Sequence, residues 1–300
     1  HARFLQVGKD VSWAIAGRSK ERLENLKKRI AKDLGNDDVL QLDTTIADIS
    51  DVSTIPSLVK DTRVVMTTVG PFEKYGSPVV ECCAKYGTHY VDITGEFDWG
   101  MEMMMQWEET AQKTGAKMIS HCGCDCIPWD LSVMKLESIL PEGESLKTVS
   151  CKDRYVMSAS GGTMNTLLLN IEGKSRPKMS KKRNFDPALR LPNGTQSSYA
   201  TKTKLPLFIQ KWKEEDSFQG SYMGGTFLAF ANAAVVKRST ALRQVSKDLV
   251  YSEYKVNPDF KTAFHEWCTQ ALGITLLTNP ITGNLVKRSK WLPKSGEGPS

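Results

Sequence analysis

Residues suited to binding a phosphate follow the first apolar run of the chain. The run from Val11 to Ala16 has the pattern of a buried strand, and Gly17, Arg18 and Ser19 come directly after it. In dinucleotide-binding folds this strand end meets the adenosine ribose, where an arginine suits the 2′-phosphate of NADP and an acidic residue suits NAD. A guanidinium can hold a phosphate through two parallel hydrogen bonds. The pattern favours NADP over NAD, although an arginine at a helix start is more often a solvated charge.

Two glycine-containing turns could bring the backbone close to a ligand. Gly70 and Pro71 follow the β-branched run 63–69, and ligands of open α/β sheets bind outside such strand ends. An ordinary strand-to-helix turn would have the same composition. A second turn, Ser160–Thr163, offers free N–H groups that could hold an anion. A simple turn with Thr163 as a helix cap explains that segment equally well.

Several side chains could move protons or bind a metal by type. Four candidate general acids are present: Tyr75, His89, His121 and Asp125. Three cysteines alternate along Cys122–Cys126, and thiolates are ligands for soft metals. Structural zinc sites, however, favour two to four residues between paired ligands and a second ligand pair elsewhere. No such second pair stands out, so we expect no metal.

The elements that must position these residues alternate between strand and helix. Strands are expected over 11–16, 39–46, 63–69, 88–94 and 116–121, and helices over 19–35, 53–60, 77–87 and 101–114. Ser19 and Ser77 are expected to cap the first and the third of these helices, and Gly35 to end the first. This rhythm with short connections predicts an α/β fold built on a doubly wound parallel sheet. The alternation of strand and helix ends near residue 131. We therefore expect two domains, over residues 1–131 and 132–300.

Composition and charge narrow the functional classes. The seven cysteines are an odd number without a disulfide pattern, which predicts reduced thiols in an intracellular protein. Residues 1–150 carry 17 Lys and Arg against 23 Asp and Glu, whereas residues 151–300 carry 23 against 11. The basic second half indicates an anionic partner, or a balance to the acidic first half. No nucleic-acid-binding module is visible, so we expect no nucleic-acid partner.

Seven segments follow one another in an order that is specific as a set. They are Ala16–Ser19, Ala47–Asp51, Val69–Phe72 with Tyr75–Gly76, Gly87–Glu96, Gly123–Leu131, Ser160–Thr163 and Leu292–Ser300. Together they resemble the saccharopine dehydrogenase-like oxidoreductases, a family that includes trans-acting enoyl reductases. The resemblance covers nearly the whole chain. It implies a Rossmann-like domain, which lacks its first strand and glycine loop here, and a second α+β domain.

The resemblance also implies roles for particular residues. The expected cofactor is NADP, held by Arg18, Ser19, Asp48, Ile49, Val69, Gly70, Pro71 and Gly95. Arg18 and Ser19 would face the adenosine phosphate, Asp48 and Ile49 the adenine, and residues 69–71 the nicotinamide. The catalytic residues implied are Tyr75 and Asp125. Both would lie near the reacting end.

Three departures from the family pattern matter. No Gly-x-Gly-x-x-Gly occurs in the 300 residues, whereas the family begins with a strand and a glycine turn. The family also continues with strands after the final motif, so we expect the chain to be truncated at both ends. Cys124 and Cys126 stand where the family often has Phe and Ser. That change affects the pocket around Asp125.

Two functions remain open at this point. The first is hydride transfer between NADP(H) and a small or lipid-like substrate. The second is a non-catalytic protein that keeps the fold at a membrane or lipid-droplet surface, with a role in lipid or glycolipid metabolism. The basic stretch 174–183, and the apolar stretch 264–286 followed by 287–291, would suit such docking. A mitochondrial location and a homodimer are also left open.

Overall fold

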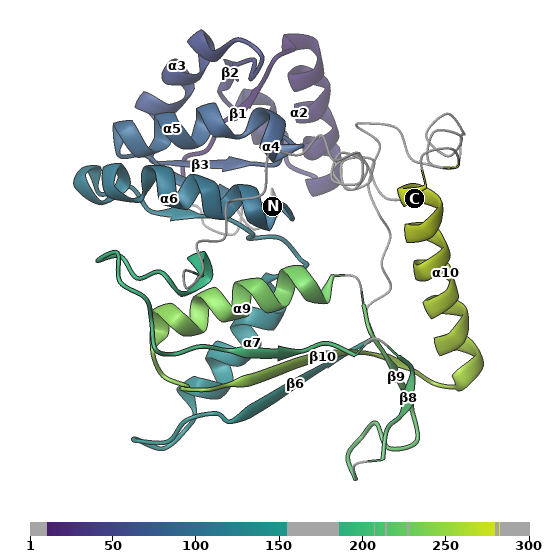
Figure 1. Cartoon of the computed structure of the whole chain (residues 1–300). Helices are drawn as coiled ribbons and strands as arrows, with labels where there is room; N and C mark the ends of the chain where they lie inside the picture. The colour runs from purple at the N-terminus through teal and green to yellow at the C-terminus, as the bar shows by residue number, and fades with distance from the viewer. Residues whose placement is uncertain are drawn as a thin grey trace.

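The computed structural model describes residues 11–154 and 186–279, except 207, 214 and 227, together with residue 282. Expectations for Ser160–Thr163, 174–183, 283–291 and Leu292–Ser300 lie outside the described residues. The described part is mixed α/β, with parallel strand pairs in its first half, as the sequence predicts. Figure 1 shows those strands with α2 to α6 above a second, larger sheet with its helices.

Two residues determine where the first described helix begins and ends. α2 (Lys20–Leu34) begins after Ser19, whose hydroxyl accepts a hydrogen bond from the Arg22 backbone N–H at 3.3 Å. The helix ends at Gly35, which has a left-handed φ of 61°. A side-chain cap at the start and glycine at the end satisfy backbone groups that the helix leaves unpaired. Both ends agree with the sequence prediction.

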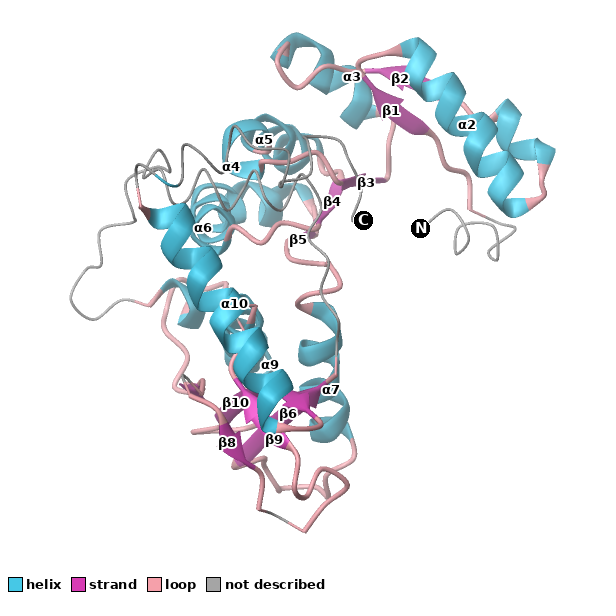
Figure 2. Cartoon of the chain, turned by 90° about the vertical axis from the view of Figure 1, so that its right-hand side faces the viewer, coloured by secondary structure: helices cyan, strands magenta, loops and turns pink. Residues whose placement is uncertain are grey.

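The parallel strands of the first half form two separate groups. β1 (Ile15–Gly17) pairs with β2 (Thr44–Ile46), while β3 (Val64–Thr67), β4 (His89–Asp92) and β5 (Met118–Ile119) pair in that order. Figure 2 shows the first pair set apart from the other three strands. A doubly wound sheet places one further strand between these two groups. The described residues supply none at that position.

Four helices connect and cover these strands: α3 (Ile55–Lys60), α4 (Phe72–Tyr75), α5 (Ser77–Tyr86) and α6 (Phe97–Thr114). Their apolar faces form one buried cluster with the strands, which includes Ile55, Val80, Cys83, Tyr90 and Trp99. Burial of such side chains stabilises the fold by about 1.5–3 kcal/mol each. The cluster holds α5 and α6 together beneath the loops that follow β3 and β4.

Two local predictions for this half are wrong. The segment 39–46 is not one strand, because Asp37–Gln41 forms a 3-10 helix (η1) capped by the Asn36 side chain and only Thr44–Ile46 is extended. Ser77 does not cap α5. Its hydroxyl instead accepts a hydrogen bond from Trp99 Nε1 at 3.1 Å. A tertiary contact has taken the oxygen that a local rule assigned to the helix end.

The second half is built on a mixed sheet. Its strands are β6 (Thr148–Asp153), β7 (Lys202–Lys204), β8 (Gln210–Lys211), β9 (Tyr222–Gly224) and β10 (Val250–Asn257). The order is β6-β10-β9-β8, and β7 also pairs with β10. The helices of this half are α7 (Ile127–Ser138), η3 (Pro187–Leu189), α9 (Ala229–Arg243) and α10 (Phe260–Thr278), whereas η2 (Val52–Thr54) directly precedes α3 in the first half. The predicted boundary after residue 131 falls inside α7, and the division into two domains stays a prediction.

The position of α9 connects the two halves. Figure 1 shows α9 between α6 and the β6–β10 strands. Val236 of α9 and Trp129 of α7 belong to the same buried cluster as Leu249 and Tyr251. On the side toward α6, Arg238 of α9 is 4.0 Å from the carboxylate of Glu108. The contact between α6 and α9 therefore joins parts of the chain that are more than a hundred positions apart in the sequence.

Candidate functional site

The residues predicted to meet the adenosine end lie after β1 and β2. Arg18 is exposed at the end of β1, and its positive charge contributes to lowering the pKa of Asp48, which follows β2. The larger causes are hydrogen bonds from Ser50, whose hydroxyl and backbone N–H donate to the Asp48 carboxylate at 2.6 and 2.9 Å. Asp48 is therefore ionised at neutral pH. Arg18 and Asp48 thus lie near enough for their charges to interact, and their roles in cofactor binding stay predictions.

Two other predicted cofactor residues have structural roles. The hydroxyl of Ser19 caps α2 and is engaged in that hydrogen bond. Ile49 is half-buried and packs against the cluster formed by α3, α5 and α6. Their roles in binding stay predictions.

The loop after β3 presents backbone rather than charged groups. Val69 and Gly70 are exposed, whereas Pro71 is buried at the start of α4. The Thr67 hydroxyl accepts a hydrogen bond from the Val69 N–H at 3.2 Å, which fixes the first turn of the loop. Gly95, in the loop after β4, has no atom within 4 Å of where a Cβ would stand. Residues 69, 70 and 95 thus leave open backbone at the ends of adjacent strands, where ligands of α/β sheets bind.

Glu96 joins the loops after β3 and β4. Its carboxylate accepts hydrogen bonds from the backbone N–H groups of Phe72 at 3.1 Å and Glu73 at 2.5 Å. These two N–H groups begin α4 and have no partner within the helix. The residue is buried, so this arrangement holds Gly70 and Pro71 in place against the loop that carries Gly95. The sequence offered no signal for this contact beyond an acidic residue within a predicted motif.

A second buried carboxylate organises the end of β4. Asp92 is 0% exposed and accepts hydrogen bonds from the Tyr90 hydroxyl at 2.8 Å and from the N–H groups of Thr94 and His121 at 3.0 Å each. Burial, with the adjacent Asp92 charge, raises the pKa of Tyr90, which therefore stays a neutral donor. Asp92 thereby ties the end of β4 to the residue that follows β5.

The tautomer of His121 follows from its partners. Its Nδ1 lies 2.7 Å from the Thr94 carbonyl oxygen, which can only accept, so Nδ1 carries the proton. Burial lowers the pKa of His121, an effect that the nearby Asp92 charge opposes. The ring is therefore neutral and Nε2 presents a lone pair. Among the described residues Nε2 has no hydrogen-bond partner.

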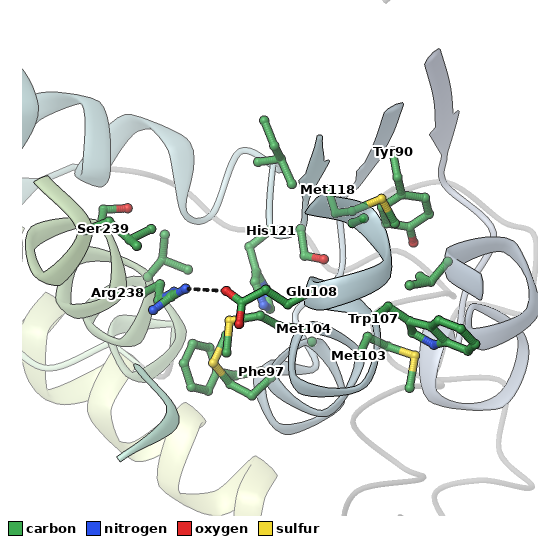
Figure 3. Close-up of a pocket in the computed structure, with 18 of the residues that line it drawn as sticks. Tyr90, Phe97, Met103, Met104, Trp107, Glu108, Met118, His121, Arg238 and Ser239 are labelled. Carbon is green, nitrogen blue, oxygen red and sulfur yellow. Dashed lines mark ion pairs between the residues drawn. The ribbon is translucent and has the colours of Figure 1, made fainter. Parts of the chain in front are cut away.

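A pocket of about 420 Å³ opens on the other side of His121. Figure 3 shows His121 in the middle of its lining, among Met104, Glu108 and Phe97. The lining residues come mainly from α6, β5 and α9 and are mostly apolar; they include Tyr90, Phe97, Met101, Met103, Met104, Trp107, Met118, Ile127, Val235 and Leu242. None of the ten residues predicted for the cofactor or catalysis lines this pocket.

The polar rim of the pocket is made of paired charges. Glu108 accepts a hydrogen bond from Arg190 Nε at 2.8 Å and lies 4.0 Å from the Arg238 guanidinium, as the dashed line in Figure 3 marks. Asp130 accepts a hydrogen bond from the Ser239 hydroxyl at 2.9 Å. The same carboxylate lies 3.4 Å from Arg243. Each acidic side chain at this rim is thus matched by an arginine.

The two predicted catalytic residues are not among those that line this pocket. Tyr75 ends α4 and is half-buried, with the Lys74 ammonium 4.9 Å from the centre of its ring. Asp125 precedes α7, and burial raises its pKa. A raised pKa suits a carboxyl group that donates a proton. No contact between these two residues is recorded, and their catalytic roles stay predictions.

The three clustered cysteines form no metal site in the part of the chain that the structure describes. No group of three or more His, Cys, Asp or Glu side chains lies close enough to hold a metal ion within that part. Burial raises the pKa of Cys126 to about 12 and also raises that of Cys122. These two side chains are therefore neutral thiols.

Comparisons with known proteins agree on one family. Residues 2–119 match the family model described as the saccharopine dehydrogenase NADP binding domain. A trans-acting enoyl reductase of Mycobacterium tuberculosis is 31% identical over 313 residues, which cover 98% of this chain and 72% of that protein. A putative trans-acting enoyl reductase of the same species is 29% identical over 246 residues, which cover 80% of this chain and 57% of that relative.

Among solved structures, the apo saccharopine dehydrogenase (L-Glu forming) of Saccharomyces cerevisiae has a TM-score of 0.45 and 14% identity, covering 86% of this chain and 52% of that one. A putative oxidoreductase from Klebsiella pneumoniae has a TM-score of 0.37 and 13% identity, with coverages of 87% and 58%. This chain thus spans little more than half of the length of several proteins that it matches.

Proposed function

Because this chain belongs to the saccharopine dehydrogenase-like oxidoreductases, we propose that it is part of an enzyme that transfers hydride between NADP(H) and a lipid-like substrate. The cofactor is NADP, since the family model that covers residues 2–119 is an NADP-binding domain. The observation that carries the proposal is the pair Arg18 and Asp48 at the ends of β1 and β2. An exposed arginine at this strand end is where a dinucleotide fold holds a 2′-phosphate.

The residues at the strand ends fit this cofactor. Arg18 would hold the 2′-phosphate, while Asp48 and Ile49 would flank the adenine. The exposed backbone of Gly70 and the open space at Gly95 leave room for the nicotinamide end, and Glu96 keeps the two loops together. NADP, when bound, supplies or accepts the hydride. Asp125, whose pKa burial raises, would hold the proton that accompanies hydride transfer, with Tyr75 as the second candidate.

The substrate class follows from the pocket and from the relatives. The relatives are named trans-acting enoyl reductases, and enoyl groups occur on acyl chains. The 420 Å³ pocket beside His121 has a largely apolar lining. A dicarboxylate amino acid would instead need unpaired cations, whereas Arg190, Arg238 and Arg243 are engaged with Glu108 and Asp130. These contacts support a lipid-like substrate over an amino-acid imine.

Titration of the full-length protein with NADPH and NADH, followed by calorimetry, tests the proposal. We expect NADPH to bind more tightly, and Arg18→Ala to weaken NADPH about tenfold or more while leaving NADH unchanged, because a charge-assisted bidentate contact is lost. The matched control is Arg29→Ala, an exposed arginine on α2, the helix that follows Arg18. Absence of binding to either dinucleotide would contradict the proposal, and equal loss in both variants would remove Arg18 from the phosphate site.

A second candidate function is docking on a membrane or lipid-droplet surface. Phe260, Phe264 and Trp267 are exposed along one side of α10 and stack at 5.8 and 6.4 Å. Aromatic side chains on one side of a helix suit an interface between water and lipid. No helix within the described residues is long and apolar enough to cross a membrane. The predicted basic stretches lie outside those residues, and the intracellular or mitochondrial location and the homodimer stay proposals.

Vesicle co-sedimentation separates this second function from the first. We expect the full-length protein to sediment with vesicles of mixed neutral and anionic lipid, and Phe264→Ser to reduce the bound fraction. Phe208→Ser is the control, because Phe208 is exposed outside α10. Charge reversal at Lys181, Lys182 and Arg183 tests the basic stretch. Binding that none of these changes affects would end the docking proposal and leave the oxidoreductase proposal intact.

A further inference from the structure

A second pocket, in the other half of the described chain, shares no lining residue with the apolar pocket beside His121. Its volume of about 370 Å³ falls within the range of small-molecule sites. The lining comes from β6, β10 and α10, with Trp129 of α7 and the segment just before α9. None of the residues assigned to the cofactor or to catalysis is among them. This polar pocket therefore has no role in the proposed function.

The lining of the polar pocket is rich in hydrogen-bonding groups. Eight of its ten described residues are polar or charged, and Trp129 and Leu228 are the other two. The contribution of α10 recurs at spacings of three and four positions, which places these side chains on one face: His265, Glu266, Thr269 and Gln270. At 3.6 residues per turn, this face points away from the exposed Phe264. A lining of this kind suits a ligand that forms many hydrogen bonds.

Several of these groups are accessible to a ligand. Lys255 Nζ lies 3.1 Å from a carboxylate oxygen of Glu266, and the two side chains are 16% and 31% exposed. Thr269 is exposed, and Thr226 and Gln270 are half-buried. The ammonium donates, the carboxylate accepts, and hydroxyl and amide groups do both. Donors and acceptors thus lie next to each other along the wall.

The charges of the lining are matched within the protein. Lys255 pairs with Glu266, and Asp153 is also engaged in an interaction. Glu253 is 0% exposed, and its carboxylate accepts three hydrogen bonds from other side chains of the protein. The described lysine and acidic residues of the lining therefore leave no partner for an ionised ligand, and burying an unpaired charge is costly. The ligand that fits is neutral.

An ion pair can bind two neighbouring hydroxyl groups without being broken. One hydroxyl accepts from the ammonium of Lys255, while the next donates to the carboxylate of Glu266. Hydrogen bonds to charged groups are stronger than those between neutral groups. Adjacent hydroxyls on a sugar ring have a spacing like that of two hydrogen-bonded atoms, which suits the 3.1 Å separation of this pair.

We infer that the polar pocket binds a neutral molecule with several hydroxyl groups, of which a sugar is the type, with adjacent hydroxyls on Lys255 and Glu266. Thr226, Thr269 and Gln270 supply further hydrogen bonds to the other hydroxyls. The inference does not depend on the proposed hydride transfer, because binding can be measured without a dinucleotide.

Matched sugars test the inference by saturation-transfer NMR titration of the full-length protein. The neutral probes are glucose, galactose and mannose. Each has two charged counterparts at pH 7, an amino sugar that is a cation and a uronate that is an anion. We expect at least one neutral sugar to bind about fivefold more tightly than both of its counterparts, because a charge would be buried without a partner. No binding of any neutral sugar, or tighter binding of a charged counterpart, would overturn the inference.

Thr269→Val places the sugar in the polar pocket. We expect it to weaken the neutral sugar about threefold, through the loss of one hydrogen bond. Thr275→Val is the matched control, because both threonines are exposed on α10 and donate to the carbonyl oxygen four residues earlier, but Thr275 does not line the pocket. Equal sugar affinity of the two variants would place the sugar elsewhere and overturn the inference.

Glu266→Gln tests the ion pair by a change of preference rather than by a loss. It leaves Lys255 without its carboxylate, so the pocket gains an unpaired cation. We expect the uronate to bind this variant about fivefold more tightly than the unmodified protein. Glu109→Gln is the control, because it breaks the exposed pair with Lys113 outside the pocket. Uronate affinity that Glu266→Gln leaves unchanged would remove the pair from the site and overturn the inference, whatever the outcome of the NADPH titration.

Discussion

The Nδ1 atom of His121 lies 2.7 Å from the carbonyl oxygen of Thr94, and this single contact fixes what the other ring nitrogen can do. Because the carbonyl oxygen accepts, Nδ1 donates, and Nε2 is left as a buried acceptor with no hydrogen-bond partner among the described residues. The backbone of the same residue donates to Asp92 at 3.0 Å. His121 thus connects the loop that carries Gly95 with the pocket between α6 and α9.

Asp92→Asn tests how much of the fold depends on this network. Asp92 is fully buried and accepts three hydrogen bonds, whereas an amide presents N–H donors to groups that also donate. We expect a loss of about 2–4 kcal/mol in the free energy of unfolding, measured by urea denaturation. The control is Asp33→Asn, at an exposed position of α2, with an expected change within ~0.5 kcal/mol. Similar losses in both would refute the central role of Asp92.

Gly95→Ala separates cofactor binding from stability. No atom lies within 4 Å of the Cβ that alanine would add, so we expect the thermal midpoint to change little. If the nicotinamide end of NADPH approaches this backbone, the new methyl group weakens NADPH binding severalfold. Calorimetric titration beside a thermal melt gives both quantities. NADPH affinity equal to that of the unmodified protein would remove Gly95 from the cofactor site.

Glu96→Gln tests the link between the loops after β3 and β4. A glutamine can offer one oxygen in place of the two that accept from Phe72 and Glu73. We expect a loss of about 1–3 kcal/mol in unfolding free energy, since charge-assisted hydrogen bonds at a helix N-terminus are lost. NADPH affinity should fall with it, because the loop that holds Gly70 and Pro71 loosens. Glu142→Gln, at an exposed loop position, should change neither quantity.

Glu253 predicts a pH dependence of stability. The residue is 0% exposed, and burial raises its pKa from 4.5 to about 7, although hydrogen bonds from Asn232 and Tyr251 oppose the shift. Asp153 adds to the shift through its charge. Between about pH 4.5 and pH 7 the folded protein therefore binds more protons than the unfolded chain. The free energy of unfolding falls as the pH rises through this window.

Glu253→Gln removes the titrating carboxyl group while keeping the size of the side chain. The difference in unfolding free energy between this variant and the unmodified protein should grow in favour of the variant through the same window. We expect a total change of up to about 3 kcal/mol, which levels off above about pH 7. Urea denaturation from pH 5 to pH 8 measures the difference. A difference that is constant with pH would mean that Glu253 does not carry this linkage.

The sequence by itself determined the local elements and the order of the family's motifs. Ser19 and Gly35 bound α2 because capping depends on residues adjacent in the chain. The alternation of strand and helix predicted the parallel pairs, and the ordered motifs predicted the family and NADP, which the family model confirms. Segment 39–46 was misassigned because its apolar run suits a strand as well as a short helix.

Tertiary structure alone decided which polar groups meet. Ser77 pairs with Trp99 instead of capping α5, and Glu96 reaches the start of α4 across 24 positions of sequence. The pocket needs α6 and α9 side by side, and no local pattern encodes that distance. The sequence named His121 as a candidate general acid by residue type, but only its neighbours in the fold determine its tautomer. Contacts between distant segments depend on how the whole chain packs, so the sequence could name this histidine but not its role.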